Sequence, residues 1–328
     1  MKIFVTGATG VLGRAAVPRL LADGAQVLGL ARSQQNCRKI SEMGAEPVKA
    51  CLFDPDAMAQ ALQGADALIH LATHLPRAKD LKRRDAWTEN DRVRRDGTRA
   101  LITAADTAGV ATILYPSVVF AYADGGTAWL RAADANLRPI DALVSTLDAE
   151  HLINDFAARR PARRGIVLRF GMFYGPQSPE SRQLYELARR GFWMPMAPDR
   201  SYKSMIWIED AASALCAALA SAPSGVYDVV EDRPCTQAEA AAALAQAVGR
   251  QRLFPLPHVL LRLLISADLR EVAARSQRIS NEAFRAATDW RPAVPDQRTG
   301  WARIAEALAQ DTPPTPNLSR PHAGHNNT

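Results

Sequence analysis

Three glycines near the N-terminus carry the strongest chemical signal, in the run Gly7-Ala8-Thr9-Gly10-Val11-Leu12-Gly13. The run follows an apolar segment at residues 2–5 and leads into an Ala/Leu-rich segment. Glycines at this spacing allow a tight turn, close approach of the backbone to a pyrophosphate, and close packing of a helix on a strand. Amides at the start of the helix then face the phosphates. A ligand-free turn is the alternative, although one glycine would satisfy it. The loop predicts a dinucleotide site formed by Gly7, Thr9, Gly10, Val11, Leu12 and Gly13.

The end of the second expected strand bears on which dinucleotide is bound. An NAD site places an acidic residue there, for the ribose hydroxyls. This chain has Ala31 at about that position, followed by Arg32 and Ser33. A guanidinium can bind a 2′-phosphate through two hydrogen bonds, and a serine hydroxyl can add a third. NADP(H) is therefore favoured over NAD(H), unless Arg32 is an ordinary solvated arginine.

Composition excludes several classes of protein. Hydrophobic residues make up 48% of the 328 residues and charged residues 23%, which is typical of a soluble globular protein. The net charge of +6 is too small to indicate a nucleic-acid partner. No apolar run approaches the ~18 residues of a membrane span. The four cysteines form no CxxC pair, so we expect no metal site, reduced thiols and a cytoplasmic location.

The order of the expected elements predicts an α/β fold with a doubly wound parallel sheet. Strand and helix patterns alternate over the first 120 residues, and Pro18 predicts a bend in the first helix. The expected strands are residues 2–5, 26–31, 47–52, 67–71, 112–114, 165–170, 205–208 and 226–230. The expected helices are residues 12–22, 57–62, 98–108, 142–158 and 211–220, with residues 121–140 a loop and residues 176–203 irregular.

We expect two domains. A dinucleotide-binding domain takes residues 1–175 and 204–230, and a smaller, mostly helical substrate domain takes residues 176–203 and 231–311. The Pro/Asn/His-rich tail, residues 312–328, is expected to be disordered.

Several motifs together resemble the extended short-chain dehydrogenase/reductase family, of the epimerase/dehydratase-like type. They are the glycine loop, Ile69-His70-Leu71-Ala72, Asp96-Gly97-Thr98, the Tyr174-Gly175-Pro176 turn, Ile206-Trp207-Ile208-Glu209-Asp210 and Asp289-Trp290-Arg291-Pro292. The resemblance implies a substrate cleft over the nicotinamide and further cofactor contacts from Leu52, Leu71 and Ala72. It also implies a small-molecule substrate, no membrane or nucleic-acid partner, and a homodimer as one possible assembly.

The chain departs from this family at the catalytic residues. The family uses a Ser or Thr with a Tyr-x-x-x-Lys pair, in which the Tyr transfers a proton while the cofactor transfers a hydride. Ser117 matches the serine, but Ala142 and Thr146 stand where the Tyr and the Lys belong. Arg94 replaces a usual Asn. Tyr122, at the end of a strand, is the candidate replacement for the missing acid.

Other residues admit two interpretations each. Tyr174, His151 and Glu150 are predicted to be structural or solvated rather than catalytic. The basic segment at residues 77–95 is either a solvated surface, because acids are interleaved, or an entry that attracts anions. The apolar cluster at residues 192–196 is either core packing or a wall of the substrate site.

Three functions remain open on the sequence. The first is an atypical NADP(H)-dependent oxidoreductase or epimerase-like enzyme, with a non-standard proton donor and a small carbonyl-type or sugar-like substrate. The second is a non-redox lyase, cyclase or isomerase on the same scaffold. The third is a non-catalytic NADP(H) sensor or binding protein. The fold by itself does not separate them.

Overall fold

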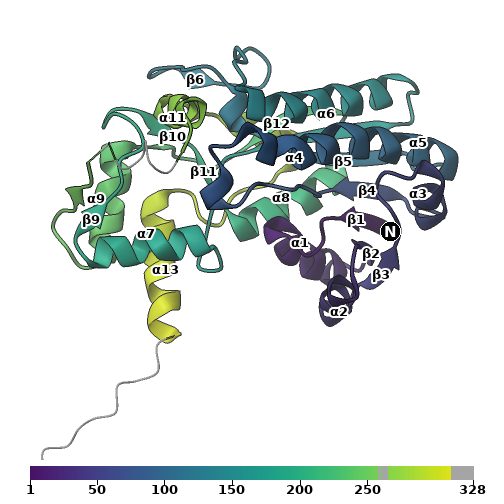
Figure 1. The fold of residues 1–328 in the computed structure, drawn as a ribbon, viewed down its shortest axis with the longest axis horizontal. Coiled ribbons are helices and arrows are strands. Elements are labelled where there is room, and N and C mark those ends of the chain that lie inside the picture. Colours follow the sequence, from purple (N-terminus) through teal and green to yellow (C-terminus); the bar gives the residue numbers. More distant parts are fainter. Residues whose placement is uncertain (258, 260–264, 312–328) are drawn as a thin grey trace, which may run out of the picture.

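A parallel sheet of seven strands forms the centre of the protein (Figure 1). The structure is a computed structural model and describes residues 1–257, 259 and 265–311. The strand order is β12-β7-β5-β4-β1-β2-β3, and every neighbouring pair is parallel. The strands are β1 (Lys2–Thr6), β2 (Gln26–Ala31), β3 (Glu46–Lys49), β4 (Ala67–His70), β5 (Thr112–Val118), β7 (Arg164–Phe170) and β12 (Gly225–Val229). The expected doubly wound α/β fold is confirmed.

Helices cover both faces of this sheet because successive strand residues point to opposite sides. Ile3 and Val5 join the apolar core on one face, whereas Phe4 joins the core on the other. The first face is covered by α1 (Val11–Ala22), α2 (Gln34–Glu42) and α8 (Ile208–Ser221). The second face is covered by α3 (Pro55–Ala61), α5 (Thr98–Ala108) and α6 (Asp141–Ala158). The cofactor loop and the strand ends are thus held by two independent cores.

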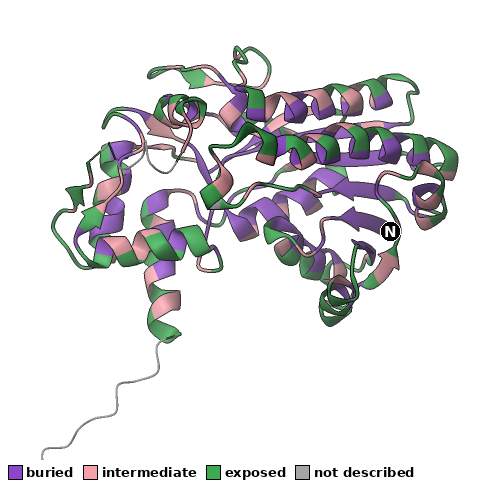
Figure 2. Cartoon of the chain, in the orientation of Figure 1, coloured by how far each residue is buried: buried purple, intermediate pink, exposed green. Residues whose placement is uncertain are grey.

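A second body of helices lies beyond the carboxyl ends of the strands, on the left of Figure 1. Its apolar core includes Tyr174, Trp207 and Trp301, and Figure 2 shows the buried faces of its helices turned inward. The helices are α7 (Pro179–Arg189), α9 (Gln237–Ala247), α11 (Ala267–Ala274) and α13 (Gln297–Gln310). Helix α12 (Glu282–Thr288) instead packs against α8 and β12, and its Phe284 joins the core of the first sheet face. The division into two domains at the boundaries given above remains a prediction.

Short elements connect these two bodies. The short strands are β6 (Trp129–Leu130), β8 (Met172–Tyr174), β9 (Phe192–Trp193), β10 (Tyr202–Lys203), β11 (Met205–Trp207), β13 (Cys235–Thr236), β14 (Phe254–Pro255) and β15 (Arg278–Ile279). The short helical segments are η1 (Ala78–Asp80), η2 (Arg84–Trp87), α4 (Thr88–Arg92), the π-turn η3 (Val93–Gly97) and η4 (Val119–Ala121). Within the described part of the chain, none of the helices combines the length and apolarity needed to cross a bilayer.

Three details differ from the sequence expectations. Residues 176–203 contain the regular helix α7, which begins because the Ser178 hydroxyl caps it and Pro179 occupies its first turn. The helix α2 was not expected, and Ser33 caps it in the same way. Helix α1 runs on through Pro18 without a break. The predicted disorder of residues 312–328 lies outside the described residues.

Candidate cofactor and substrate site

The glycine loop packs against the end of the neighbouring strand so closely that side chains are excluded. Gly7 has φ +69°, and a Cβ built on it would lie 2.5 Å from the carbonyl carbon of Leu71. A Cβ on Gly13 would lie 2.4 Å from the carbonyl oxygen of Gly7. Two of the three glycines therefore hold β1, α1 and the end of β4 together. They also bring Leu71 and Ala72 beside the loop, as the resemblance implied.

The third glycine leaves the start of α1 open. Gly10 is the N-cap residue, and no side chain caps the helix. A Cβ on Gly10 would meet only the Gly7 oxygen, at 3.2 Å. The first turn of α1 thus keeps unsatisfied backbone N–H groups behind a surface without side chains, which suits a pyrophosphate. The residues present fit a dinucleotide cofactor.

Arg32 and Ser33 follow β2 and lie at the expected adenosine end of this site. Arg32 is exposed and forms no hydrogen bond or ion pair with any of the described residues. The Ser33 oxygen accepts a hydrogen bond from the Asn36 backbone N–H at 3.2 Å, which leaves its own hydrogen free to donate. Leu52 is buried and contacts the Gly97 backbone. The roles of these residues in binding remain predictions.

Ser117 lies at the end of β5, but its hydroxyl points into the protein. It is 2% exposed and donates to Oε1 of Glu150 on α6. Glu150 also receives two hydrogen bonds from Arg169 on β7, at 3.0 and 2.6 Å. The structural role predicted for Glu150 thus has a geometric basis, and Ser117 belongs to the same buried ion-pair network.

Tyr122, the candidate acid, lies in the interior rather than in a cleft. It is fully buried, donates to Oδ1 of Asp228 at 2.8 Å and accepts from Arg169 at 2.9 Å. Burial raises the pKa of Tyr122 far above its usual value and raises the pKa of Asp228 to about 7. Because both sides of its hydroxyl are occupied, Tyr122 holds strand ends together, and the structure gives no support to the catalytic role predicted for it.

The positions of the missing Tyr and Lys are closed by packing. Ala142 is buried in a small apolar cluster with Trp87, Ile140 and Val272. Thr146 is 1% exposed. The replacement residue Arg94 is also buried, and it donates to the hydroxyl of Tyr115. The ordinary proton relay of the resembled family therefore has neither its residues nor its space.

The structure also bears on the basic segment at residues 77–95, His151 and Tyr174. In the basic segment, arginines pair with the interleaved acids, as in Arg84–Asp91 at 3.2 Å and Arg99–Asp96 at 3.0 Å further along. These pairs favour a solvated surface. His151 is exposed on α6, and Tyr174 packs edge-on against Trp207 at 5.4 Å between ring centres.

An apolar cavity of about 320 Å³ lies between the sheet and the second helical body. Phe120, which follows β5, and Met172, which follows β7, place one wall at the carboxyl ends of the strands. Ligand sites of α/β sheets form at this edge. The other lining residues are Leu81, Leu184, Trp193, Met194, Met196, Lys203, Ser204, Met205, Gln237, Ala240, Leu244, Ile265, Leu269, Val272, Ala273, Gln277, Gln297 and Trp301. Three residues of the apolar cluster at 192–196 thus line a cavity.

Sequence reasoning missed Lys203, which is the one charged residue among these lining residues. Its signal was weak, because a single lysine in a short strand is common on a surface. Only the pairing of β10 with β13 and the approach of α11 enclose it.

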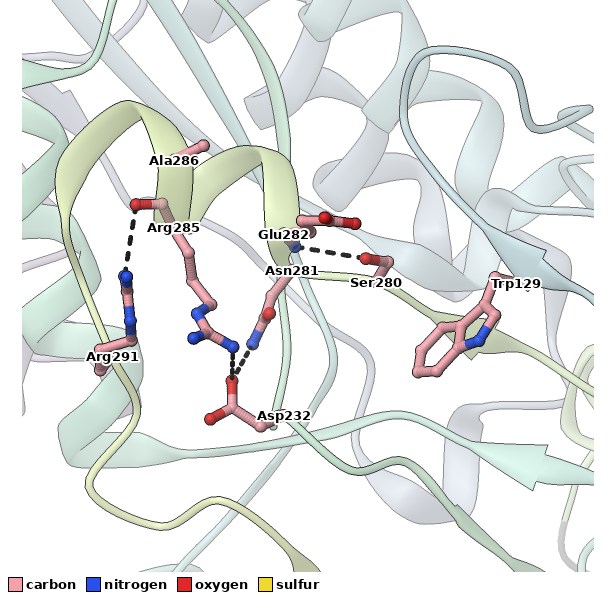
Figure 3. A pocket seen from close by; sticks show the side chains of 8 residues that line it. All are labelled: Trp129, Asp232, Ser280, Asn281, Glu282, Arg285, Ala286 and Arg291. Atoms are coloured by element: carbon pink, nitrogen blue, oxygen red, sulfur yellow. Dashed lines mark hydrogen bonds and ion pairs between the residues drawn. The ribbon is translucent and has the colours of Figure 1, made fainter.

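A second hollow, of about 380 Å³, lies beyond β12 and is more polar (Figure 3). Its Asp232 carboxylate accepts from Asn281 at 2.8 Å and pairs with Arg285 at 3.2 Å. Arg291 donates to the carbonyl oxygens of Arg285 and Trp290. Because these charged groups already satisfy one another, this hollow offers less to a ligand than the apolar cavity does.

Known proteins resemble the chain over most of its length. A 3-diazoavenalumate denitrifying reductase from Streptomyces is 28% identical over 313 residues, which is 92% of this chain and all of that protein. A ceramide reductase from Caulobacter vibrioides is 30% identical over 78% of this chain and 73% of its own length.

Among solved structures, a human epimerase family protein with NADPH superposes with a TM-score of 0.76 at 22% identity, covering 93% of this chain and 99% of that one. The UDP-glucose 4-epimerase of Thermotoga maritima gives 0.75 at 18%, covering 95% and 99%. These two likenesses support the fold. Residues 3–230 match the model of the NAD dependent epimerase/dehydratase family. The chain therefore belongs to this family of NAD(P)-binding enzymes, which has reductases and epimerases among its relatives.

Proposed function

We propose that the protein is an NADP(H)-dependent reductase of an apolar small molecule, working without a tyrosine proton donor. The observation that carries this proposal is the apolar cavity, one wall of which is formed by Phe120 and Met172, two residues beyond the ends of β5 and β7. A sugar ring would meet few hydrogen-bonding groups there, whereas an apolar or aromatic body gains from burial. Two relatives, matched over 92% and 78% of this chain, are named as reductases, which supports the same reaction class.

The chain's own residues would hold the cofactor at its phosphates. The open first turn of α1, behind Gly10, would hold the pyrophosphate, and the unpaired Arg32 guanidinium would bind the 2′-phosphate. When bound, NADPH supplies a hydride. Since Arg32 makes no contact within the described chain, it can turn to a phosphate without breaking an existing bond.

The source of the proton follows from the closed helix α6. Ala142 carries no proton, and the buried Thr146 supplies no cation to tune one. The proton needed to complete a carbonyl reduction therefore comes from outside α6, from water or from the Lys203 ammonium in the cavity wall. We therefore expect a slow reductase for ordinary ketones, with faster turnover for substrates whose reduced form is a weak base.

The test follows deuterium from cofactor to product. Purified protein is mixed with NADPH carrying deuterium at the transferable position and with a panel of apolar aldehydes, ketones and enones. We expect loss of NADPH absorbance and one deuterium in the product. The variant Ala240→Phe fills the cavity from α9, so it should abolish turnover and leave NADPH affinity within about twofold.

Two outcomes would overturn the proposal. Tight NADPH binding without oxidation by any member of the panel would favour the binding protein. Conversion of a substrate with no change in cofactor absorbance would favour a lyase or isomerase.

A further inference from the structure

One cation stands alone in an apolar cavity. Of the described residues that line it, Lys203 is the only one with a formal charge. Other residues of the lining, such as Phe120, Val272 and Ala273, provide no opposite charge. Lys203 is half-buried, and an ammonium that is partly removed from water without a paired acid costs free energy, so its presence in such a wall calls for a reason.

The lysine is held in place by main-chain oxygens. Its Nζ donates to the carbonyl oxygen of Arg275 at 2.6 Å and to that of Ala273 at the end of α11. An ammonium has three N–H donors, so one remains for a ligand. No acidic side chain in the described residues forms an ion pair with Lys203. Burial lowers its pKa to about 8, opposed by the charge of Asp124.

Two of the polar lining residues, Ser204 and Gln277, are already engaged. The hydroxyl of Ser204 donates to the Gln277 carbonyl oxygen at 3.0 Å and accepts from the Ile279 N–H at 3.1 Å. The Gln277 amide donates to the carbonyl oxygen of Tyr122 at 2.8 Å. The remaining Lys203 donor is therefore the strongest point of attraction in the cavity.

We infer that the cavity binds a mostly apolar or aromatic molecule with a single anionic group, such as a carboxylate, which accepts a hydrogen bond from Lys203. One ammonium with one free donor matches one negative charge. A diphosphate carries more negative charge than one ammonium can balance. This inference rests on the proposed function for its biological meaning, since it describes the substrate of that reaction, but its test needs neither cofactor nor turnover.

The test compares two fluorescent probes that share a ring system. Anilinonaphthalene sulfonate carries one negative charge, and phenylnaphthylamine is the same molecule without it. Both are titrated into the full chain without NADPH. We expect the anionic probe to bind about tenfold more tightly than the neutral probe, because a charge-assisted hydrogen bond is added. Naphthoate should displace it, and naphthamide should do so about tenfold less well.

The variant Lys203→Met keeps the length of the side chain and removes the charge. This variant should lower the affinity for the anionic probe about tenfold and change the affinity for the neutral probe by less than about twofold. Lys203→Arg should retain most of the preference for the anion. The control is Lys39→Met on the exposed side of α2, which makes the same change of charge and should alter neither affinity.

Further variants fix the location of the probe. Ala240→Phe should abolish binding of both probes. If thermal melts show that this variant does not fold, Trp193→Phe should reduce energy transfer from tryptophan to the bound probe, because Trp193 lines the cavity.

Equal affinities of the two probes for the unmodified protein would overturn the inference, as would an equal loss of both in Lys203→Met or no binding at all. A charge preference in a protein that never oxidises NADPH would leave the inference standing and count against the proposed reductase. If neutral substrates alone oxidise NADPH and the two probes bind equally well, the proposed reductase stands and the inference about the anionic group is overturned.

Discussion

Single residues in this protein decide affinity and charge rather than fold. Arg32 is exposed and unpaired within the described residues, whereas Arg169 and Glu150 neutralise each other in the interior. Lys203 lies between these cases, enclosed by carbonyl groups and without an acid. A residue's chemistry here follows from the partners that the fold leaves it.

Arg32→Glu tests the preference for the phosphorylated cofactor. We expect the affinity for NADPH to fall about 10- to 100-fold, because a charge-assisted pair becomes a repulsion, and the affinity for NADH to change by less than about threefold. Isothermal titration with both nucleotides measures this. Arg200→Glu makes the same charge change on an exposed loop far along the chain and should alter neither. Equal losses for NADPH and NADH would remove the phosphate role of Arg32.

Asp228→Asn tests the buried carboxyl beside Tyr122. Burial raises the folded-state pKa of Asp228 from its usual 3.8 to about 7, with Arg169 opposing that rise and Glu150 adding to it. Between these two values the folded protein keeps a proton that the unfolded chain releases. The contribution of Asp228 to the free energy of unfolding therefore declines as the pH rises from about 4 to 7 and is constant above that.

Asn at position 228 stays neutral and still accepts from the Tyr122 hydroxyl. Relative to the unmodified protein, Asp228→Asn should gain about 2 kcal/mol in free energy of unfolding between pH 5 and pH 7. Urea unfolding at the two pH values measures it. The exposed Asp134→Asn should show no such gain. Parallel pH profiles for Asp228→Asn and the unmodified protein would show that Asp228 ionises normally.

At the scale of elements, the packing of helices on strands decides which substitutions the site tolerates. The junction of β1 and α1 is closed on its inner side and open on its outer side. Helix α6 presents its modified catalytic positions to a packed cluster. The same helix can therefore keep the family's shape after its catalytic pair is gone.

Gly13→Ala and Gly10→Ala separate packing from binding in one turn. A Cβ at Gly13 would collide with the backbone at 2.4 Å, so we expect a loss of about 2–4 kcal/mol in free energy of unfolding. A Cβ at Gly10 has one tight contact and points where a pyrophosphate would lie. The free energy of unfolding of Gly10→Ala should fall by less than about 1 kcal/mol, and its affinity for NADPH should fall at least about tenfold. Chemical denaturation and NADPH titration of both variants measure the two effects, and a reversed order would contradict this division of roles.

Restoring the family's pair should damage the protein rather than reactivate it. In Ala142→Tyr with Thr146→Lys, the new ring must displace Trp87 or Val272, and the new ammonium takes the place of a side chain that is 1% exposed. We expect a loss of more than about 3 kcal/mol of stability, measured by thermal and urea unfolding. Ala158→Tyr at the exposed end of α6 is the control for the helix itself. A stable double variant with reductase activity would show that the cluster is looser than its packing indicates.

At the scale of the whole molecule, the sheet with its covering helices and the second helical body provide two different sites. In the proposed function, the nucleotide binds at the start of α1, beside the sheet (Figure 1), whereas the helical body closes an apolar cavity over the strand ends. Because the two sites are lined by different residues, we expect NADPH at saturation to raise the melting temperature without displacing anilinonaphthalene sulfonate. Displacement of the probe by NADPH, followed by fluorescence, would instead place the probe in the nucleotide site.

The sequence alone determined the parts that depend on local pattern. The alternation of strand and helix, the glycine loop, and the absence of a Tyr-x-x-x-Lys pair can all be read residue by residue, because period and spacing determine them. The expected strand at residues 26–31 and the helix at residues 98–108 coincide with β2 and α5. Helix α7 was missed because its Pro and Gly flanks resemble a loop, although Ser178 and Pro179 are a helix start.

Only the tertiary structure decided what the side chains at the strand ends do. Tyr122 lies five residues after Ser117 and appeared able to replace the missing acid. Asp228 and Arg169, from strands distant in the sequence, nevertheless occupy its hydroxyl. No sequence pattern marked Lys203, because its enclosure depends on the packing of α11 and the residue that follows it. The reason is physical: a side chain's pKa and free donors depend on burial and on partners brought by contacts far apart in sequence, and no local pattern encodes them.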